Sequence, residues 1–161
     1  MKKVIYLTVL CCSMFTASFG QTFDLSSTAF EVGDKYMPEP KIWFYYARDE
    51  IQDSSYIILD KIAAFLIENK SVVVEVGQHT DWVNPKYSIR YTDKRAKSIV
   101  TYLIGKGISK ERLIPKGYGD SKMLIPKVKI DQLTNEEEKQ KARMVNRRTE
   151  FVILSTNYNG K

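Results

Sequence analysis

The sequence predicts an α/β fold, with a single sheet of about four strands that alternates with helices. Short β-branched or apolar runs alternate along the chain with segments whose apolar residues recur at helical spacing. Strands and helices in such alternation favour one sheet with helices packed on it. At 161 residues, 43% of them hydrophobic and 27% charged, the chain has room for one such domain and a short appendage.

Residues 1–20 have the layout of a secretory signal peptide and are set aside from the fold. Lys2 and Lys3 precede an uncharged apolar run, which is followed by small residues. This run is shorter than the ~20 apolar residues that span a bilayer. The alternative is an N-terminal membrane anchor. Both cysteines, Cys11 and Cys12, lie in this segment and fit a lipoprotein cleavage site poorly, so we expect the exported chain to contain no cysteine.

The basic composition bears on the partners of the protein. The formal net charge of +6 falls to +4 once Lys2 and Lys3 are removed, and the pI is about 9.2. A basic protein raises the hypothesis of a nucleic-acid partner. Exported proteins rarely meet nucleic acid, however, and the positive residues are scattered rather than clustered. We therefore expect no nucleic-acid partner, and a carboxylate-rich cell wall is the more natural one.

The first predicted elements follow a leader, residues 21–40, which has no clear apolar period. Residues 42–46 are apolar and aromatic and predict a first strand. A helix is predicted over 55–68, and the β-branched run 72–76 predicts the next strand. The apolar face of that helix is formed by Ile58, Ile62, Phe65 and Leu66.

The second predicted helix has the clearest pattern in the sequence. Thr92 is a suitable cap for its start, and Gly105 with Gly107 supplies a stop. A strand over 113–117 follows after a single turn. The buried stripe of the helix, at positions i, i+3, i+4, i+7 and i+8, consists of Ala96, Ile99, Val100, Leu103 and Ile104.

The C-terminal part is predicted to complete the domain, which we place at residues 41–156 before a tail at 157–161. Residues 119–133 contain glycine, proline and lysines and predict a long surface loop. Residues 134–137 have the form of a capping box that opens a charged third helix. Residues 150–154 predict the last strand.

Four motifs, in the right order, resemble the C-terminal domain family of OmpA and MotB. They are Val-Glu-Val-Gly-Gln-His-Thr-Asp at 74–81, Thr-Asp-Lys-Arg-Ala at 92–96, Gly-Ile-x-x-x-Arg-Leu and Lys-Gly-Tyr-Gly-Asp within 107–120, and Asn-Arg-Arg-Thr-Glu at 146–150. The resemblance implies a βαβαβ-αβ sandwich and a periplasmic module that tethers to the cell wall. It also implies non-covalent binding of peptidoglycan through the diaminopimelate of its stem peptide, without catalysis, cofactor or metal.

The resemblance implies that Asp81 and Arg95 hold the ligand. The free end of diaminopimelate carries an ammonium and a carboxylate on one carbon, which an anion and a guanidinium fork can bind together. Asp81 ends a predicted strand, and Arg95 stands fourteen residues on, in the first turn of the second predicted helix. The free N–H groups of a helix start also favour a carboxylate. Without the resemblance, Asp81 could simply cap a turn and Arg95 could be a solvated helix residue.

The family pattern implies roles for further residues. Ligand contacts are expected from Thr80, Ser88 and Arg147, with Arg147 at the pocket mouth or in an internal ion pair. Structural support is expected from His79, through hydrogen bonds that hold the loop, and from Thr92, Asn146 and Arg148. One histidine and no cysteine after export exclude a multi-histidine metal site.

The loop at residues 82–88 departs from the family pattern, because it contains no glycine and has Ser88 where asparagine is expected. This departure motivates an alternative function, an OmpA-like protein-interaction domain that has lost wall binding. An enzyme is not expected, because the sequence offers no carboxylate dyad and no nucleophile with its base. The leader could connect the domain to an outer-membrane protein.

Overall fold

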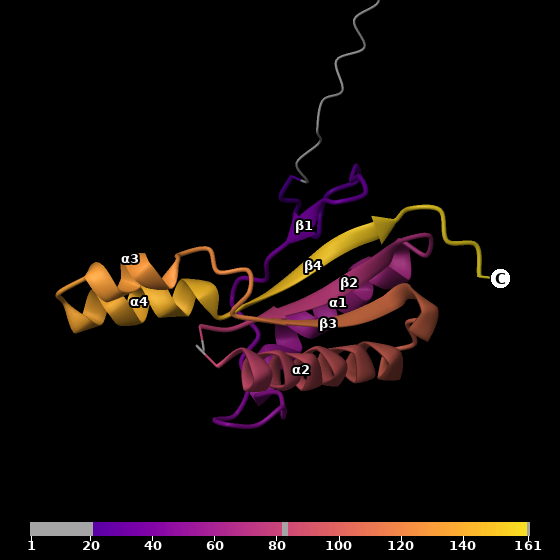
Figure 1. The fold of residues 1–161 in the computed structure, drawn as a ribbon. Helices are drawn as coiled ribbons and strands as arrows, with labels where there is room; N and C mark the ends of the chain where they lie inside the picture. The colour runs from indigo at the N-terminus through magenta and orange to yellow at the C-terminus, as the bar shows by residue number, and fades with distance from the viewer. Residues whose placement is uncertain (1–20, 82–83, 161) are drawn as a thin grey trace, which may run out of the picture.

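The computed structural model describes residues 21–81 and 84–160. The predicted signal peptide (1–20) and loop residues 82–83 lie outside them. The described chain forms a four-stranded mixed sheet with strand order β1-β4-β2-β3 (Figure 1), which confirms the predicted α/β class. β2 pairs in parallel with β3 and antiparallel with β4, and β4 pairs antiparallel with β1. The strands are β1 (Lys35–Tyr36), β2 (Val73–His79), β3 (Leu113–Gly119) and β4 (Arg148–Ser155).

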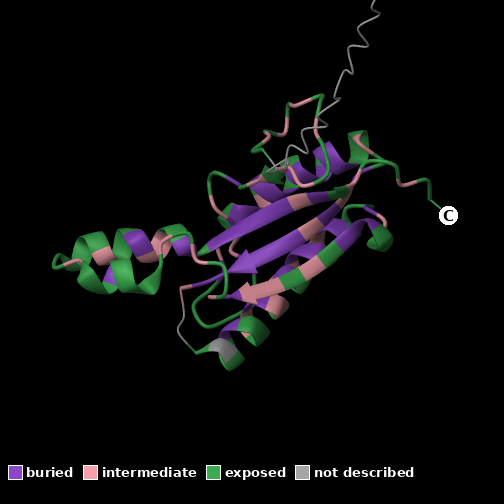
Figure 2. Cartoon of the chain, turned by 45° about the horizontal axis from the view of Figure 1, so that its top comes forward, coloured by how far each residue is buried: buried purple, intermediate pink, exposed green. Residues whose placement is uncertain are grey.

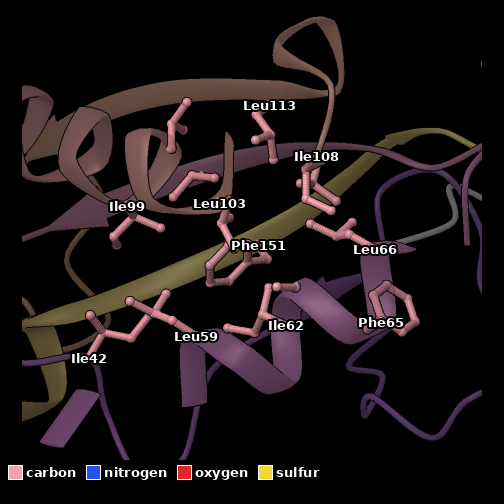
Figure 3. Close-up of a cluster of buried hydrophobic side chains, with 14 of the residues drawn as sticks. Ile42, Leu59, Ile62, Phe65, Leu66, Ile99, Leu103, Ile108, Leu113 and Phe151 are labelled. Carbon is pink, nitrogen blue, oxygen red and sulfur yellow. The ribbon is translucent and has the colours of Figure 1, made fainter. Parts of the chain in front are cut away.

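Two helices, α1 (Tyr56–Glu68) and α2 (Pro85–Gly105), share one hydrophobic core with the sheet. Single-turn 3-10 helices precede α1 at Asp53–Ser55 and β3 at Lys110–Arg112. Figure 3 shows the core, in which side chains of α1 and α2 meet those of the strands; among them are Leu59, Ile62, Ile99, Leu103 and Phe151. Each is almost completely buried, which stabilises the fold by about 1.5–3 kcal/mol per side chain.

The first strand lies elsewhere than predicted. Residues 42–46 do not form a strand, and only an isolated bridge joins Phe44 to Ile51. The apolar character of this run reflects burial, since Ile42 and Phe44 lie in the core. A short apolar run does not by itself distinguish a strand from another buried segment. β1 instead lies in the leader segment, where Lys35 pairs with Val152 of β4.

α2 begins seven residues before the predicted cap Thr92, with Pro85 in its first turn. Proline favours the first helical position because its missing N–H would have no partner there. Thr92 is therefore not a cap. It is buried within the helix, where its hydroxyl donates to the Ser88 carbonyl (2.8 Å) and accepts from the Gly119 N–H (3.0 Å).

α2 packs directly on the backbone of β3. A Cβ added to Gly117 would lie 2.3 Å from the backbone nitrogen of Asp93, closer than any real contact. Gly119 has φ +55°, a left-handed conformation that favours glycine. These glycines permit the close approach that fixes α2, and with it Tyr91 and Arg95, against the sheet.

The predicted loop at 119–133 contains a short helix, α3 (Lys127–Gln132), which is followed by α4 (Glu136–Asn146). Asn135, rather than Thr134, caps α4, and its side chain accepts from the N–H groups of Glu137 and Glu138. The α3–α4 hairpin stands away from the sheet in Figure 1 and is largely exposed in Figure 2, in which the buried residues run along the strands. Within the described residues, no helix is long and apolar enough to cross a bilayer.

Candidate functional site

Asp81 lies just beyond the end of β2 and is bound by Arg147, just before β4. His79 and Arg148 are register partners across these adjacent strands, so the flanking residues face each other. Arg147 Nε donates to Asp81 Oδ1 at 2.6 Å and Nη2 donates to Oδ2 at 2.9 Å. Two parallel hydrogen bonds of this kind form a strong bidentate pair, and they raise the pKa of Arg147. The Asp81 side chain is 9% exposed, whereas that of Arg147 is 46% exposed.

Arg95 does not pair with Asp81. Its guanidinium carbon lies 4.5 Å from the centre of the Phe44 ring and 4.1 Å from that of Tyr91. Its Nε donates to the Arg48 carbonyl at 3.0 Å, and Nη2 donates to the Tyr45 carbonyl at 3.4 Å. Burial lowers the pKa of Arg95. The side chain therefore has cation–π and backbone partners that the sequence pattern did not indicate.

The position of Arg95 along α2 also differs from the prediction. Because the helix begins at Pro85, Arg95 lies in its third turn, about 15 Å along the axis from the start. The free N–H groups of a helix start act only within the first turn. The contribution that we expected from them beside Arg95 is therefore absent.

Arg147, Arg95 and Tyr91 are nevertheless neighbours. The charge of Arg147 contributes, after burial, to lowering the pKa of Arg95, and Tyr91 interacts electrostatically with both guanidinium groups. We call Asp81, Tyr91, Arg95 and Arg147 the Asp81 cluster. It combines one carboxylate with two guanidinium cations, so its net charge is positive. Arg147 Nη1 makes only a long contact with Met144 Sδ, at 3.9 Å, among the described residues.

Thr80 and Ser88, which were also expected to contact the ligand, have hydrogen-bond partners within the fold. The Thr80 hydroxyl approaches Asp81 Oδ1 at only 3.5 Å, and the Thr80 N–H donates to the Gly119 carbonyl at 2.9 Å. Ser88 is fully buried, and its hydroxyl donates to Asp120 Oδ1 at 3.1 Å. Ser88 therefore lies in the interface between α2 and the end of β3.

Comparison with known proteins assigns the chain to a family. The model of the OmpA family matches residues 43–142, well over half of the chain. The chain belongs to the OmpA family. Domains of this family are non-enzymatic.

Two curated relatives of the chain are much longer proteins. The chain is 30% identical over 118 residues to the photosystem I P700 chlorophyll a apoprotein A2 of Gloeobacter violaceus and 27% identical over 116 residues to outer membrane porin F of Pseudomonas fluorescens. These matches cover 73% and 71% of this chain. They cover only 13% and 32% of the two curated relatives.

Solved structures show the same fold. A MotB-like protein of Desulfovibrio vulgaris aligns with a TM-score of 0.61 at 21% identity, over 79% of this chain and 76% of that one. The peptidoglycan-associated lipoprotein of Burkholderia pseudomallei aligns with a TM-score of 0.57 at 18% identity, over 70% and 88% of the two chains.

His79 does not support the OmpA-family domain in the way expected. Among the described residues, neither ring nitrogen has a hydrogen-bond partner. The ring is stacked on Tyr118, with centroids 4.8 Å apart and planes 8° from parallel. Burial, with the positive charge of Arg148, lowers the pKa of His79 to about 4 although Glu150 Oε2 lies 3.7 Å away. A neutral, stacked imidazole packs here, so the predicted hydrogen-bonding role is wrong.

Asn146 and Arg148, which were expected to support the structure, are buried and form hydrogen bonds within the fold. Asn146 is completely buried and forms two hydrogen bonds with the Ile125 backbone, at 3.0 and 2.8 Å. Arg148 is buried, and its Nε donates to Glu150 Oε1 at 2.6 Å while Nη2 donates to the Lys122 carbonyl at 3.0 Å. Both side chains fix the segment that connects β3 to the α3–α4 hairpin.

Two cavities, of about 480 and 470 Å³, lie apart from Asp81. The first is lined by residues near the C-terminal tail, including Arg112, whose guanidinium donates to the carbonyls of Val72, Leu66 and Asn69. Across the described residues, no group of three acidic, histidine or cysteine side chains could hold a metal ion.

Proposed function

We propose that this OmpA-family domain binds peptidoglycan non-covalently through the diaminopimelate of its stem peptide, as a cell-wall tethering module in the periplasm. The observation that carries the proposal is the Asp81 cluster, in which the carboxylate at the end of β2 is paired with Arg147, and Arg147 in turn lies close enough to Arg95 to lower its pKa. The ligand carbon carries one ammonium and one carboxylate, so it needs an anion and a cation a few ångströms apart. The cluster supplies both.

Binding requires an exchange of partners at Asp81. Both of its oxygens accept hydrogen bonds from Arg147, so an incoming ammonium replaces one cation with another. This exchange keeps the largely buried carboxylate paired throughout, which avoids the penalty of an unpaired buried charge. Arg147 is half-exposed and can then turn to the ligand carboxylate, together with Arg95. A guanidinium fork can bind that carboxylate bidentately.

The same ion pair favours a second candidate function. A carboxylate whose two oxygens are already bonded is also what a closed, inactive pocket would contain. In that case the domain would keep its fold and serve as a protein-interaction module. The two functions differ in their response to cell-wall material.

Co-sedimentation with purified peptidoglycan sacculi tests the proposal. The wild-type protein should sediment with sacculi, and Asp81→Ala should weaken binding by about 2 kcal/mol or more, roughly thirtyfold, because the ligand ammonium loses its counter-ion. Arg95→Ala and Arg147→Ala should also remain in the supernatant. A folded wild-type protein that stayed in solution would reject wall binding and favour the protein-interaction module.

Matched controls remove the same charges elsewhere. Asp131 pairs with Lys127 on α3, and Arg143 pairs with Glu136 on α4, both on exposed helical surface. Asp131→Ala and Arg143→Ala should sediment like the wild type. Free meso-diaminopimelate should release the protein from sacculi, whereas cadaverine, which carries two ammonium groups and no carboxylate, should not. Equal release by both would remove the carboxylate clamp from the proposal.

The periplasmic location rests on residues 1–20, which lie outside the described residues. If this segment is a signal peptide, the exported protein should begin close to Gln21. N-terminal sequencing of the protein recovered from a bacterial periplasmic fraction measures this. A retained Met1 in a membrane fraction would instead indicate the N-terminal anchor.

A further inference from the structure

A tight hairpin next to the Asp81 cluster displays a tyrosine that the fold does not use. Phe44 and Ile51 form the bridge at its base, and the Tyr45 N–H donates to the Glu50 carbonyl at 3.0 Å. We call residues 45–50 the 45–50 hairpin. Tyr46 lies at its tip and is 96% exposed. A tyrosine ring is a large apolar surface, and leaving one almost entirely in water contributes nothing to the core.

Hydrogen bonds from Arg95 stabilise the 45–50 hairpin, although one of its residues has an unfavourable backbone conformation. Ala47 has φ +55°, a left-handed conformation that residues with a Cβ rarely adopt. Arg95 holds the turn by donating to the carbonyls of Tyr45 and Arg48, at 3.4 and 3.0 Å. Such conformations persist where the surrounding contacts determine them, and they concentrate at ligand-binding sites. The exposed ring of Tyr46 is therefore displayed on a fixed support.

Arg95 joins this hairpin to the Asp81 cluster. Its guanidinium stacks on Tyr91, which interacts electrostatically with Arg147, and Arg147 binds Asp81. On α2, Tyr87 lies one turn before Tyr91 on the same face and is 55% exposed. The exposed Tyr87 and the partly buried Tyr91 therefore share one face of α2, and Arg95 connects that face to the 45–50 hairpin.

The chemistry of the hairpin favours a sugar over other occupants. Arg48 and Glu50 are exposed and paired at 3.2 Å, so charges of both signs flank Tyr46. A surface of mixed sign gives no advantage to a polyanion or an anionic membrane. A pyranose ring offers an apolar C–H face that can cover a tyrosine ring and hydroxyls that can bond the flanking polar groups. In peptidoglycan the stem peptide is attached to such a sugar.

We propose that Tyr46 on the 45–50 hairpin is a carbohydrate-stacking subsite, which contacts the glycan strand while the Asp81 cluster holds the stem peptide. The inference rests on the proposed function and extends it from the peptide to the sugar. Arg95 is a positioning residue for this subsite, because it acts on the glycan only through the hairpin.

Titration with two soluble probes tests the subsite. One probe is a stem peptide that contains diaminopimelate and no sugar, and the other is the same peptide attached to its disaccharide. Tyr46→Ala should bind the disaccharide-peptide roughly three- to tenfold more weakly than the wild type, the effect of losing one stacked ring. Its affinity for the sugar-free peptide should be unchanged. Tyr46→Phe, which keeps the ring, should restore binding.

The outcomes separate the two proposals. Ile57→Ala on α1 removes a comparably exposed apolar side chain and should change neither affinity. If the wild type binds both probes, Asp81→Ala binds neither, and Tyr46→Ala matches the wild type, the subsite is rejected and the proposed function stands. An equal loss for both probes in Tyr46→Ala would show that the hairpin shapes the peptide pocket instead. A wild type that binds neither probe overturns both proposals.

Discussion

Arg147 and Arg95, which the resemblance both placed at the ligand, make different contacts in the structure. Arg147 binds Asp81 from a position 66 residues along the chain, whereas Arg95 is clamped between two aromatic rings. The resemblance to the OmpA and MotB family singled out Asp81, Arg95 and Arg147. It could not give the pairing, because Asp81 and Arg147 meet only through the adjacency of β2 and β4, which no local pattern encodes.

His79 gives a pH-dependence that can be measured directly. Burial holds its pKa at about 4 in the folded protein, against 6.5 ordinarily, so between these values the unfolded chain binds a proton that the folded chain does not. Stability should therefore be complete above pH 6.5 and fall as the pH drops towards 4. The loss between pH 7 and 5 should be roughly 2 kcal/mol, measured by urea denaturation.

The variant His79→Phe serves as the control for this measurement, because it keeps the stack on Tyr118 and removes the titrating group. Since His79 is the only histidine, little else titrates between pH 7 and 5.5. The stability of His79→Phe should be nearly flat over that range. Parallel curves for the two proteins would contradict the assignment.

At the scale of the elements, α2 does most to position the site. Four members of its predicted stripe, Ala96, Ile99, Val100 and Leu103, are buried, because a regular apolar spacing reports a buried helical face. The fifth member, Ile104, was predicted wrongly, since its side chain is 39% exposed near the end of the helix. The first two turns of α2 were not predictable, because Pro85 is equally typical of a loop. β1 was also unpredictable, because two residues are too few to show a period. Within the leader, Phe23 and Phe30 pack on Phe65, each with centroids 5.6 Å apart.

The contact between α2 and β3 predicts a strong effect of a single methyl group. Gly117→Ala would place a Cβ 2.3 Å from the backbone of Asp93, so helix and strand must separate. We expect a loss of about 3 kcal/mol in the free energy of unfolding, at the upper end for overpacking because the neighbour is backbone. Thermal or urea denaturation measures it.

Gly105 provides the matched comparison, since a Cβ there would meet no atom within 4 Å. Gly105→Ala should leave stability unchanged or raise it by up to about 1 kcal/mol, because alanine favours the helical conformation. Similar destabilisation of both variants would contradict the packing argument.

For the molecule as a whole, the sequence predicted the α/β class. The alternation of strand-like apolar runs with segments of helical apolar spacing was sufficient for this prediction. The strand order β1-β4-β2-β3 was not predictable from alternation alone, since the same elements can be arranged in several orders. The α3–α4 hairpin was partly predicted, because Asn135 and the acidic residues after it signal a helix start. α3 was missed because six residues that follow a proline resemble a loop.

The central position of β4 in the sheet also determines when the Asp81 cluster forms during folding. β4 is the last strand of the sequence, yet it pairs with both β1 and β2, and Arg147 stands at its entrance. Until β4 inserts between β1 and β2, the sheet is incomplete and Arg147 is not positioned to pair with Asp81. Because β4 follows the other three strands of the sheet along the chain, the Asp81 cluster can form only after those strands have been synthesised.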